Sequence, residues 1–312
     1  MTRASDAPTP AAVYRGRFAP SPTGPLHFGS LVAAVGSFLE ARTRGGAWLL
    51  RMEDLDRPRE QPGARDAILY TLEACGLVWD GPVAAQSERS DAYHAALHRL
   101  THAGAAFPCA CSRREIADSA LAGIEGPVYP GTCRDGLPHG RRPRAVRVLT
   151  AGAAPIAFTD PVQGEVGQDV AADVGDFVIY RADRIVAYQL AVVVDDALQG
   201  ITDVVRGADL LHSTPRQILL QRLLGIRTPR YVHLPVAVNA AGEKLSKQTR
   251  ATAVDPARPV EALARVMRFL GHPPPAGLED ASVGTFWQWA LEAWRLERVP
   301  RAAAIVAEPS GS

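Results

Sequence analysis

Residues 17–30 constrain the fold more than any other part of the chain. An apolar-leaning run at 13–18 enters this stretch and predicts a buried strand, and a helical run at 31–42 leaves it. Three prolines and two glycines lie between them and interrupt regular structure, because proline fixes φ and glycine permits turns. A strand, a tight turn and a helix start together form a ready anion site, since unpaired N–H groups point at the ligand. An ordinary first strand-to-helix turn of a parallel sheet would look the same.

The composition limits the classes of protein that fit. A length of 312 residues allows about two domains, and no apolar run is long enough to span a bilayer. Residues 1–12 are polar and rich in Ala and Pro, which predicts a disordered leader, no membrane partner and a cytoplasmic protein. The formal charge is +1, so any contact with RNA depends on a local basic patch.

A predicted strand at 47–52 ends in the acidic sequence Glu53-Asp54-Leu55-Asp56. Acidic residues at the carboxyl end of a parallel strand face the crevice in which α/β sheets bind ligands. A buried carboxylate there needs a cation, and a substrate ammonium would serve. The alternative is a solvated turn rich in charge.

Three of the four cysteines lie close together in the sequence, at Cys109, Cys111 and Cys133. In a reducing compartment such a cluster favours metal binding over disulfides. Three thiolates supply three corners of a zinc tetrahedron, and the cysteine count leaves the fourth ligand open. His139 would be the conventional choice, and spacing alone does not select a tyrosine.

Two further polar groups have more than one interpretation. His94, His98 and His102 recur every four residues on a predicted helix at 91–102, where a solvated face is favoured over a metal site. Five arginines form a basic cluster that is opposed locally only by Asp135. This cluster fits either phosphate contacts or a solvated charge run: Arg134, Arg141, Arg142, Arg144 and Arg147.

The second half of the chain is predicted to mix strands and helices. Its continuous apolar run at 191–194 predicts a strand buried on both faces, which ends a hairpin begun at Asp176. Thr214 is expected to cap a helix with Pro215 at its first position. Further strands are expected at 145–149, 156–160 and 232–238, amphipathic helices at 260–270 and 286–299, and a frayed tail at 301–312.

Several motifs resemble the glutamate branch of the class I aminoacyl-tRNA synthetases. Arg-Phe-Ala-Pro-Ser-Pro-Thr-Gly at 17–24 is followed by the "HIGH" signature, here His27-Phe28-Gly29-Ser30, with a small residue at the last position as that branch often has. Tyr-Gln-Leu-Ala-Val-Val-Val-Asp-Asp at 188–196 and Val-Arg-Gly at 205–207 are similar as well. Lys244-Leu245-Ser246-Lys247-Gln248 resembles the "KMSKS" loop, and the resemblance covers roughly residues 14–249.

The resemblance implies an α/β fold with a Rossmann-like parallel sheet, a zinc-bearing insertion and a short C-terminal helical stem, without an anticodon-binding domain. The expected divisions are the leader at 1–12, catalytic halves at 13–107 and 185–250, the insertion at 108–184, and the stem and tail at 251–312. The arrangement Cys-x-Cys and then Tyr-x-x-x-Cys resembles the zinc site of the short glutamate-activating paralogue within this branch. The resemblance therefore adds Tyr129 to Cys109, Cys111 and Cys133 as a zinc ligand.

The resemblance also implies the substrate site. Arg17 and Arg206 would take the two carboxylates of glutamate, Glu53 its ammonium, and Tyr188 would complete the pocket. Which arginine holds which carboxylate is left open. The loop residues Phe18, Ala19, Pro20 and Ser21 would also contact glutamate. ATP, with Mg²⁺ on its phosphates, would meet His27, Gly29, Ser30, Lys244 and Lys247, of which His27, Gly29 and Lys247 would be catalytic.

The Cys/Tyr pattern and the short C-terminal part point within this branch to the glutamyl-queuosine tRNA(Asp) synthetase family. That family implies activation of L-glutamate by ATP without tRNA, followed by transfer to queuosine at the wobble position of tRNA(Asp). We expect a monomer whose RNA partner is the anticodon loop. A minimal glutamyl-tRNA synthetase that charges an acceptor end and a non-catalytic tRNA-binding paralogue are the alternatives.

Overall fold

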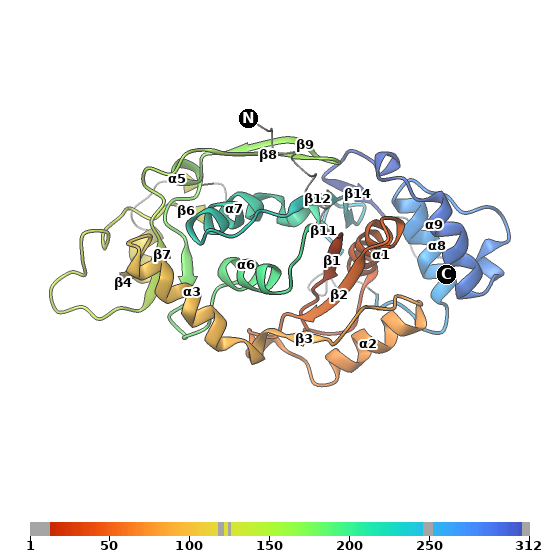
Figure 1. Cartoon of the computed structure of the whole chain (residues 1–312), viewed down its shortest axis with the longest axis horizontal. Helices are drawn as coiled ribbons and strands as arrows, with labels where there is room; N and C mark the ends of the chain where they lie inside the picture. The colour runs from red at the N-terminus through yellow and green to blue at the C-terminus, as the bar shows by residue number, and fades with distance from the viewer. Residues whose placement is uncertain (1–12, 118–121, 124–125, 246–251, 308–312) are drawn as a thin grey trace, which may run out of the picture.

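The computed structural model describes residues 13–117, 122–123, 126–245 and 252–307 (Figure 1). The predicted leader at 1–12 and the end of the KLSKQ motif, including Lys247, lie outside the described residues. The helices are α1 Phe28–Thr43, α2 Ala64–Ala74, α3 Ser90–His102, α4 Arg113–Ala117, α5 Val170–Asp173, α6 Tyr188–Leu198, α7 Thr214–Leu223, α8 Pro259–Phe269 and α9 Val283–Ala293. None of these helices is both long and apolar enough to cross a bilayer.

The strands form several small sheets. They are β1 Arg15–Phe18, β2 Ala47–Met52, β3 Ala84–Ala85, β4 Ala106–Cys109, β5 Ala122–Gly123, β6 Gly126–Pro127, β7 Ala145–Val148, β8 Ile156–Asp160, β9 Gly164–Gln168, β10 Val178–Tyr180, β11 Asp203–Gly207, β12 Arg230–Leu234, β13 Val236–Val238 and β14 Ala304–Val306. The order β1-β2-β3 is parallel throughout, and β11 pairs with β12 in parallel. β10, β7 and β4 form an antiparallel sheet, and β8 pairs with β9 as a hairpin.

The two parallel sheets, β1-β2-β3 and β11-β12, meet where β1 lies beside β11. The backbone N–H of Thr202 donates to the carbonyl of Arg15 (2.9 Å), and the N–H of Arg15 donates to the Thr202 hydroxyl (2.8 Å). The first residues of β1, β2 and β11 are therefore aligned, and all three strands end at one edge. That edge is where a parallel sheet is expected to bind its ligand.

Two large cores lie on either side of these strands. One joins α1, β1 and β2 to α8 and α9, with Phe38 packed against both Trp48 (5.3 Å between ring centroids) and Trp287 (4.8 Å). Figure 1 shows α8 and α9 beside α1 at one end of the molecule, and β4 and β7 at the opposite end. The second core lies under α3, α6 and α7, and a small third core surrounds Cys109 and Tyr129.

The run at 191–194 is not a strand, and that prediction is wrong. It lies in α6, every residue of which from Gln189 to Asp196 is buried. A helix buried on all sides is apolar all round, so its sequence cannot be told from a doubly buried strand by periodicity. The predicted hairpin is present only as far as Val186, which bridges Tyr180 before α6 begins.

Other boundaries differ in smaller ways. The strands at Ala47–Met52 and Ile156–Asp160 are confirmed. Thr214 is the first residue of α7 rather than its cap, and the strand expected at 232–238 is broken by Pro235 into β12 and β13. The helix expected at 286–299 runs from Val283 to Ala293. In the tail expected to fray, Ala304–Val306 pairs in parallel with β13 as β14.

Candidate active site

A cavity of about 730 Å³ lies at the carboxyl edge of the parallel strands, a size typical of small-molecule sites. Every residue predicted for glutamate or ATP lines it except Lys247, which lies outside the described residues. The lining includes Arg17, Phe18, Ala19, Pro20, Ser21, His27, Gly29, Ser30, Glu53, Tyr188, Arg206 and Lys244. Residues distant in the sequence meet here because β1, β2, α6 and β11 all face this edge.

The start of α1 forms one wall of the cavity. His27 occupies the N-cap position, where its Nδ1 accepts from the backbone N–H of Ser30 (3.3 Å) and its Nε2 lies 3.0 Å from the Ser30 hydroxyl. No acidic residue occupies the first turn, so the positive end of the helix dipole faces the cavity uncompensated. A Cβ at Gly29 would lie 3.2 Å from the Leu245 carbonyl oxygen, which explains a glycine where the KLSKQ motif approaches the helix.

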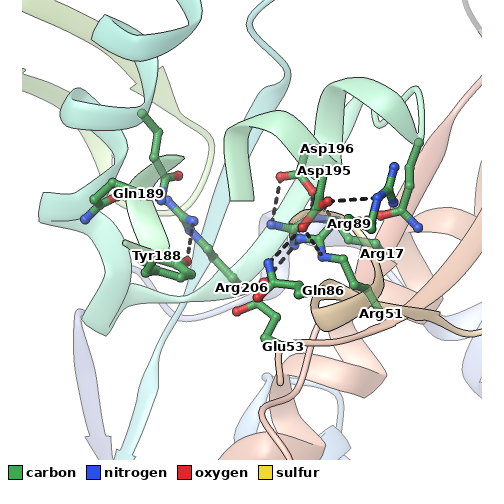
Figure 2. A network of polar contacts seen from close by, with 12 residues as sticks. Arg17, Arg51, Glu53, Gln86, Arg89, Tyr188, Gln189, Asp195, Asp196 and Arg206 are labelled. Carbon is green, nitrogen blue, oxygen red and sulfur yellow. Dashed lines mark hydrogen bonds and ion pairs between the residues drawn. The ribbon is translucent and has the colours of Figure 1, made fainter. Parts of the chain in front are cut away.

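The guanidinium of Arg17 is already bound to a carboxylate. Its Nε and Nη2 donate to the two oxygens of Asp196 (3.1 and 3.2 Å), and both side chains are buried. Arg51, which is fully buried, donates to the same carboxylate (2.8 Å) and to Glu53 (3.2 Å). Figure 2 shows Glu53 between this cluster and Arg206. Burial raises the pKa of the Glu53 carboxyl despite Arg51 and Arg17, so a further cation beside it would favour the ionised form.

Asp195, the neighbour of Asp196 on α6, binds a second set of polar side chains in the same cluster. It accepts from Gln86 and from the Tyr93 hydroxyl (2.8 Å each), and Arg89 lies 3.2 Å away. Adjacent carboxylates on one helix thus hold arginines and polar groups from three other segments (Figure 2). The cluster fixes the position of Arg17 and Glu53 at the cavity wall.

Arg206 has no such partner. Its Nε donates to His233 Nε2 (3.1 Å), its Nη1 to the Tyr188 hydroxyl (3.3 Å), and its Nη2 to the Thr214 hydroxyl (2.7 Å) and the Leu210 carbonyl (3.4 Å). Burial lowers the pKa of His233 to about 4, and Arg206 lowers it as well, so the imidazole is neutral near pH 7. All partners of this buried cation within the described chain are therefore uncharged.

Lys244 stands at the base of the KLSKQ motif on the opposite wall. Its Nζ lies 2.5 Å from Asp209, and its backbone bridges Val238 at the end of β13. The turn that carries it is closed by hydrogen bonds between Asn239 and Glu243. A lysine placed here can reach an anion at the start of α1.

Three thiols and one phenol converge in the third core. The Sγ atoms of Cys109, Cys111 and Cys133 lie within 4.8 Å of one another. The Tyr129 hydroxyl is 3.5 Å from Cys109 Sγ and 3.7 Å from Cys111 Sγ, and Cys111 and Cys133 are 3.8 Å apart. Tetrahedral zinc would require sulfur–sulfur edges of about 3.8 Å and sulfur–oxygen edges of about 3.5 Å, given its usual bond lengths. The four donors fit a metal ion, whereas His139 is exposed and outside the group.

Comparison with known proteins gives the family of the chain. Residues 14–279 match the family model of class I tRNA synthetases (E and Q), catalytic domain. A curated protein named Glutamyl-Q tRNA(Asp) synthetase from Dechloromonas aromatica is 61% identical over 94% of this chain and 98% of its own length. A protein of the same name from Aromatoleum aromaticum is 59% identical over 93% of this chain and 92% of its own length.

The chain belongs to the glutamyl-Q tRNA(Asp) synthetase family of class I synthetases.

A solved relative extends the comparison to structure. The glutamate tRNA ligase from Elizabethkingia meningosepticum, crystallised with its amino acid, is 26% identical with a TM-score of 0.76. The match covers 93% of this chain but 66% of that one. The α/β fold of this member of the glutamyl-Q family is thus that of a class I synthetase catalytic domain.

Several features of the site could not be found by scanning the sequence. Asp196 and Asp209 cannot be recognised from the sequence as partners of Arg17 and Lys244, because neither pair is close in the sequence. Arg51 sits within a predicted strand, and only its full burial reveals its charge as important. The alternation of charge around 51–56 is the one local signal that could have suggested a polar cluster.

Three arginines of the basic cluster near the thiols have partners within the protein that the sequence does not indicate. Arg134 binds Asp176 (2.6 Å), Arg141 binds Glu115 (2.6 Å), and Arg147 stacks on Tyr129 (4.2 Å to the ring centroid). Asp135 is the acidic residue that lies near these arginines in the sequence, and the two carboxylates that bind Arg134 and Arg141 are distant in the sequence. His94, His98 and His102 are exposed, and none belongs to the metal-binding group found among the described residues.

Proposed function

We propose that this chain activates L-glutamate with ATP without requiring tRNA, and then transfers the glutamyl group to queuosine at the wobble position of tRNA(Asp). The names of its curated relatives support this assignment. The observation that carries the activation step is the cavity itself. It brings a buried guanidinium with uncharged partners, Arg206, together with Glu53 and the positive end of α1.

Glutamate binding follows from the charges on the wall. Arg206 is the principal anchor for one carboxylate, because no other anion neutralises it. Arg17 offers the second carboxylate its Nη1 and the remaining N–H of Nη2, since Asp196 accepts from Nε and from one N–H of Nη2. Glu53 takes the ammonium, and Tyr188 donates its hydroxyl toward the substrate. Residues 18–21, at the end of β1 and directly after it, border the glutamate site.

The ATP phosphates lie at the start of α1 in this proposal. His27, Ser30 and the first backbone N–H groups of α1 hold them, and Gly29 leaves room for them. Lys244 and Lys247 of the KLSKQ motif supply positive charge to the same phosphates. Mg²⁺ bound to ATP would neutralise part of the phosphate charge. The α-carboxylate of glutamate attacks the α-phosphorus in line, a new O–P bond forms, and the bond to pyrophosphate breaks. Catalysis is positioning and electrostatic stabilisation, with no covalent enzyme intermediate.

In the second step a hydroxyl of the queuosine cyclopentenediol attacks the glutamyl carbonyl, and AMP leaves. The anticodon loop would enter this cavity, which lies between the catalytic halves 13–107 and 185–250. The residues that line the cavity all belong to these two ranges. The enzyme would act as a monomer in the cytoplasm, where ATP, glutamate and tRNA are present.

The four donors at Cys109, Cys111, Tyr129 and Cys133 would hold a structural Zn²⁺ that fixes the insertion. Cys111→Ser should remove most of the bound zinc, measured by elemental analysis of the purified protein. Cys75→Ser is the matched control, because Cys75 is buried in the first core and far from the group in sequence. Stoichiometric zinc in Cys111→Ser would refute this ligand set.

The test of the function uses labelled glutamate, ATP and two tRNA pools, one from queuosine-replete cells and one from cells that cannot make queuosine. Label on the replete pool alone is expected. Equal label on both would indicate a minimal glutamyl-tRNA synthetase that charges an acceptor end. No label on either, without glutamate-dependent pyrophosphate exchange, would indicate a non-catalytic paralogue.

A further inference from the structure

Asp160 and His233 lie directly behind Arg206 and do not line the cavity. His233 is on β12 beside β11, with its Nδ1 2.7 Å from Asp160 Oδ2 and its Nε2 3.1 Å from Arg206 Nε. Both side chains are fully buried. The three residues therefore form a continuous chain from the carboxylate, through the imidazole, to the guanidinium.

The hydrogen bonds determine where the imidazole proton lies. Asp160 also accepts from the backbone N–H groups of Val162, Gln163 and His233, at 2.8 to 2.9 Å. A carboxylate with so many N–H donors stays ionised. The proton of a neutral His233 is then on Nδ1, facing Asp160, and Nε2 is left as an acceptor for Arg206.

Thr214 completes the support. Its hydroxyl accepts from Arg206 Nη2 (2.7 Å) and lies 3.0 Å from His233 Nε2, to which it can donate its own proton. Arg206 is thus held by its Nε and Nη2 through neutral acceptors, and its Nη1 is directed to Tyr188 in the cavity wall. A carboxylate in place of His233 would hold the guanidinium equally well but would cancel its charge.

We infer that Asp160, His233 and Thr214 are positioning residues for the substrate carboxylate: they fix Arg206 without neutralising it. Asp160 belongs to the β8–β9 hairpin, inside the predicted insertion. The Gln163 side chain in its turn donates to the His233 carbonyl (2.9 Å). The insertion would therefore contribute to glutamate binding as well as carry the thiol group. This inference rests on the proposed glutamate site.

The experiment compares His233→Asn with His233→Gln. An Asn amide can reach the position of Nδ1 and keep the contact with Asp160, but it leaves Arg206 Nε–H without an acceptor. A Gln amide oxygen can reach the position of Nε2 and accept from Arg206. The readout is glutamate-dependent ATP–pyrophosphate exchange, with KM measured separately for glutamate and for ATP, and Tm measured for each variant.

We expect His233→Asn to raise the KM for glutamate about tenfold or more, with the KM for ATP within twofold of the wild type. His233→Gln should restore most of the affinity. If both variants raise the two KM values equally, or if His233→Asn leaves the KM for glutamate unchanged, the inference is wrong. Wild-type protein without glutamate-dependent exchange would instead overturn the proposed function.

A second pair of variants keeps the test decisive if His233→Asn does not fold. Thr214→Val keeps the shape and removes the acceptor for Nη2, whereas Thr214→Ser keeps the hydroxyl. A selective rise in the KM for glutamate in the valine variant alone supports the inference. Equal KM values for glutamate in the two Thr214 variants contradict it.

Discussion

Arg17 and Arg206 both line the cavity and are 4% and 5% exposed, yet their surroundings are opposite. Arg17 lies against a carboxylate that Arg51 also binds, so its charge is compensated within the protein. Arg206 lies among an imidazole, two hydroxyls and a carbonyl. Burying a cation without a counter-ion costs several kcal/mol, and a bound carboxylate would relieve that cost. We therefore expect Arg17 to contribute mainly to the stability of the fold and Arg206 mainly to the affinity for the substrate.

The largest expected effect comes from removing the uncompensated charge. Arg206→Gln should lower kcat/KM for glutamate about 10²- to 10³-fold in pyrophosphate exchange, because the proposed buried charge contact with the substrate would be lost. Its free energy of unfolding should stay within about 1 kcal/mol of the wild type, since no carboxylate loses a partner. A large loss of stability would show that Arg206 is compensated after all, and the comparison would fail.

The neutral state of His233 predicts a pH dependence of stability. Its pKa falls from the ordinary 6.5 to about 4 on folding, so stability from the neutral form is present above pH 6.5 and lost as pH falls toward 4. The full contribution is roughly 3 kcal/mol. Urea unfolding of the wild type and of His233→Asn between pH 7 and 4.5 should show a steeper loss for the wild type. Parallel curves would contradict a neutral imidazole beside Arg206.

Arg17→Gln, unlike Arg206→Gln, should lower the stability of the fold. Asp196 would keep only Arg51, and the free energy of unfolding should fall by about 2 kcal/mol in urea titrations. Adding Asp196→Asn should recover part of that loss, because the orphaned carboxylate is removed. If Arg17→Gln is as stable as the wild type, the cluster around Asp196 does not stabilise the fold as argued.

Asp209→Asn should have the smallest effect. Asp209 and Lys244 are 34% and 46% exposed, and such a pair contributes less than about 1 kcal/mol to stability. The KM for glutamate should change by less than about threefold. A tenfold rise would indicate that the Arg206 side also depends on a carboxylate.

The residues that line the cavity can be predicted from the sequence better than the partners that determine their charge. The cavity residues fall in contiguous motifs, so the resemblance to known synthetases located them together. The partners that decide their charge state do not: Asp196 lies 179 residues from Arg17, and Asp160 lies 73 from His233. Hydrophobic periodicity carries no information about such pairings. It also fails for α6, since a run of valines buried on all sides has the same pattern in a helix and in a strand.

The parallel pairing of β13 with β14 links the end of the described chain to the active site. Val236 and Ala237 line the cavity and pair with Ala304 and Ile305, and the Leu245 N–H donates to the carbonyl of Ala237 (2.8 Å). Deleting residues after 303 would remove β14, the strand that pairs with β13 and thereby supports the backbone contacts of Lys244 and Leu245. A bulky tag fused there would disturb the same pairing. On the proposed function, variants shortened for crystallisation should then lose nucleotide affinity without any change at a residue proposed to contact ATP.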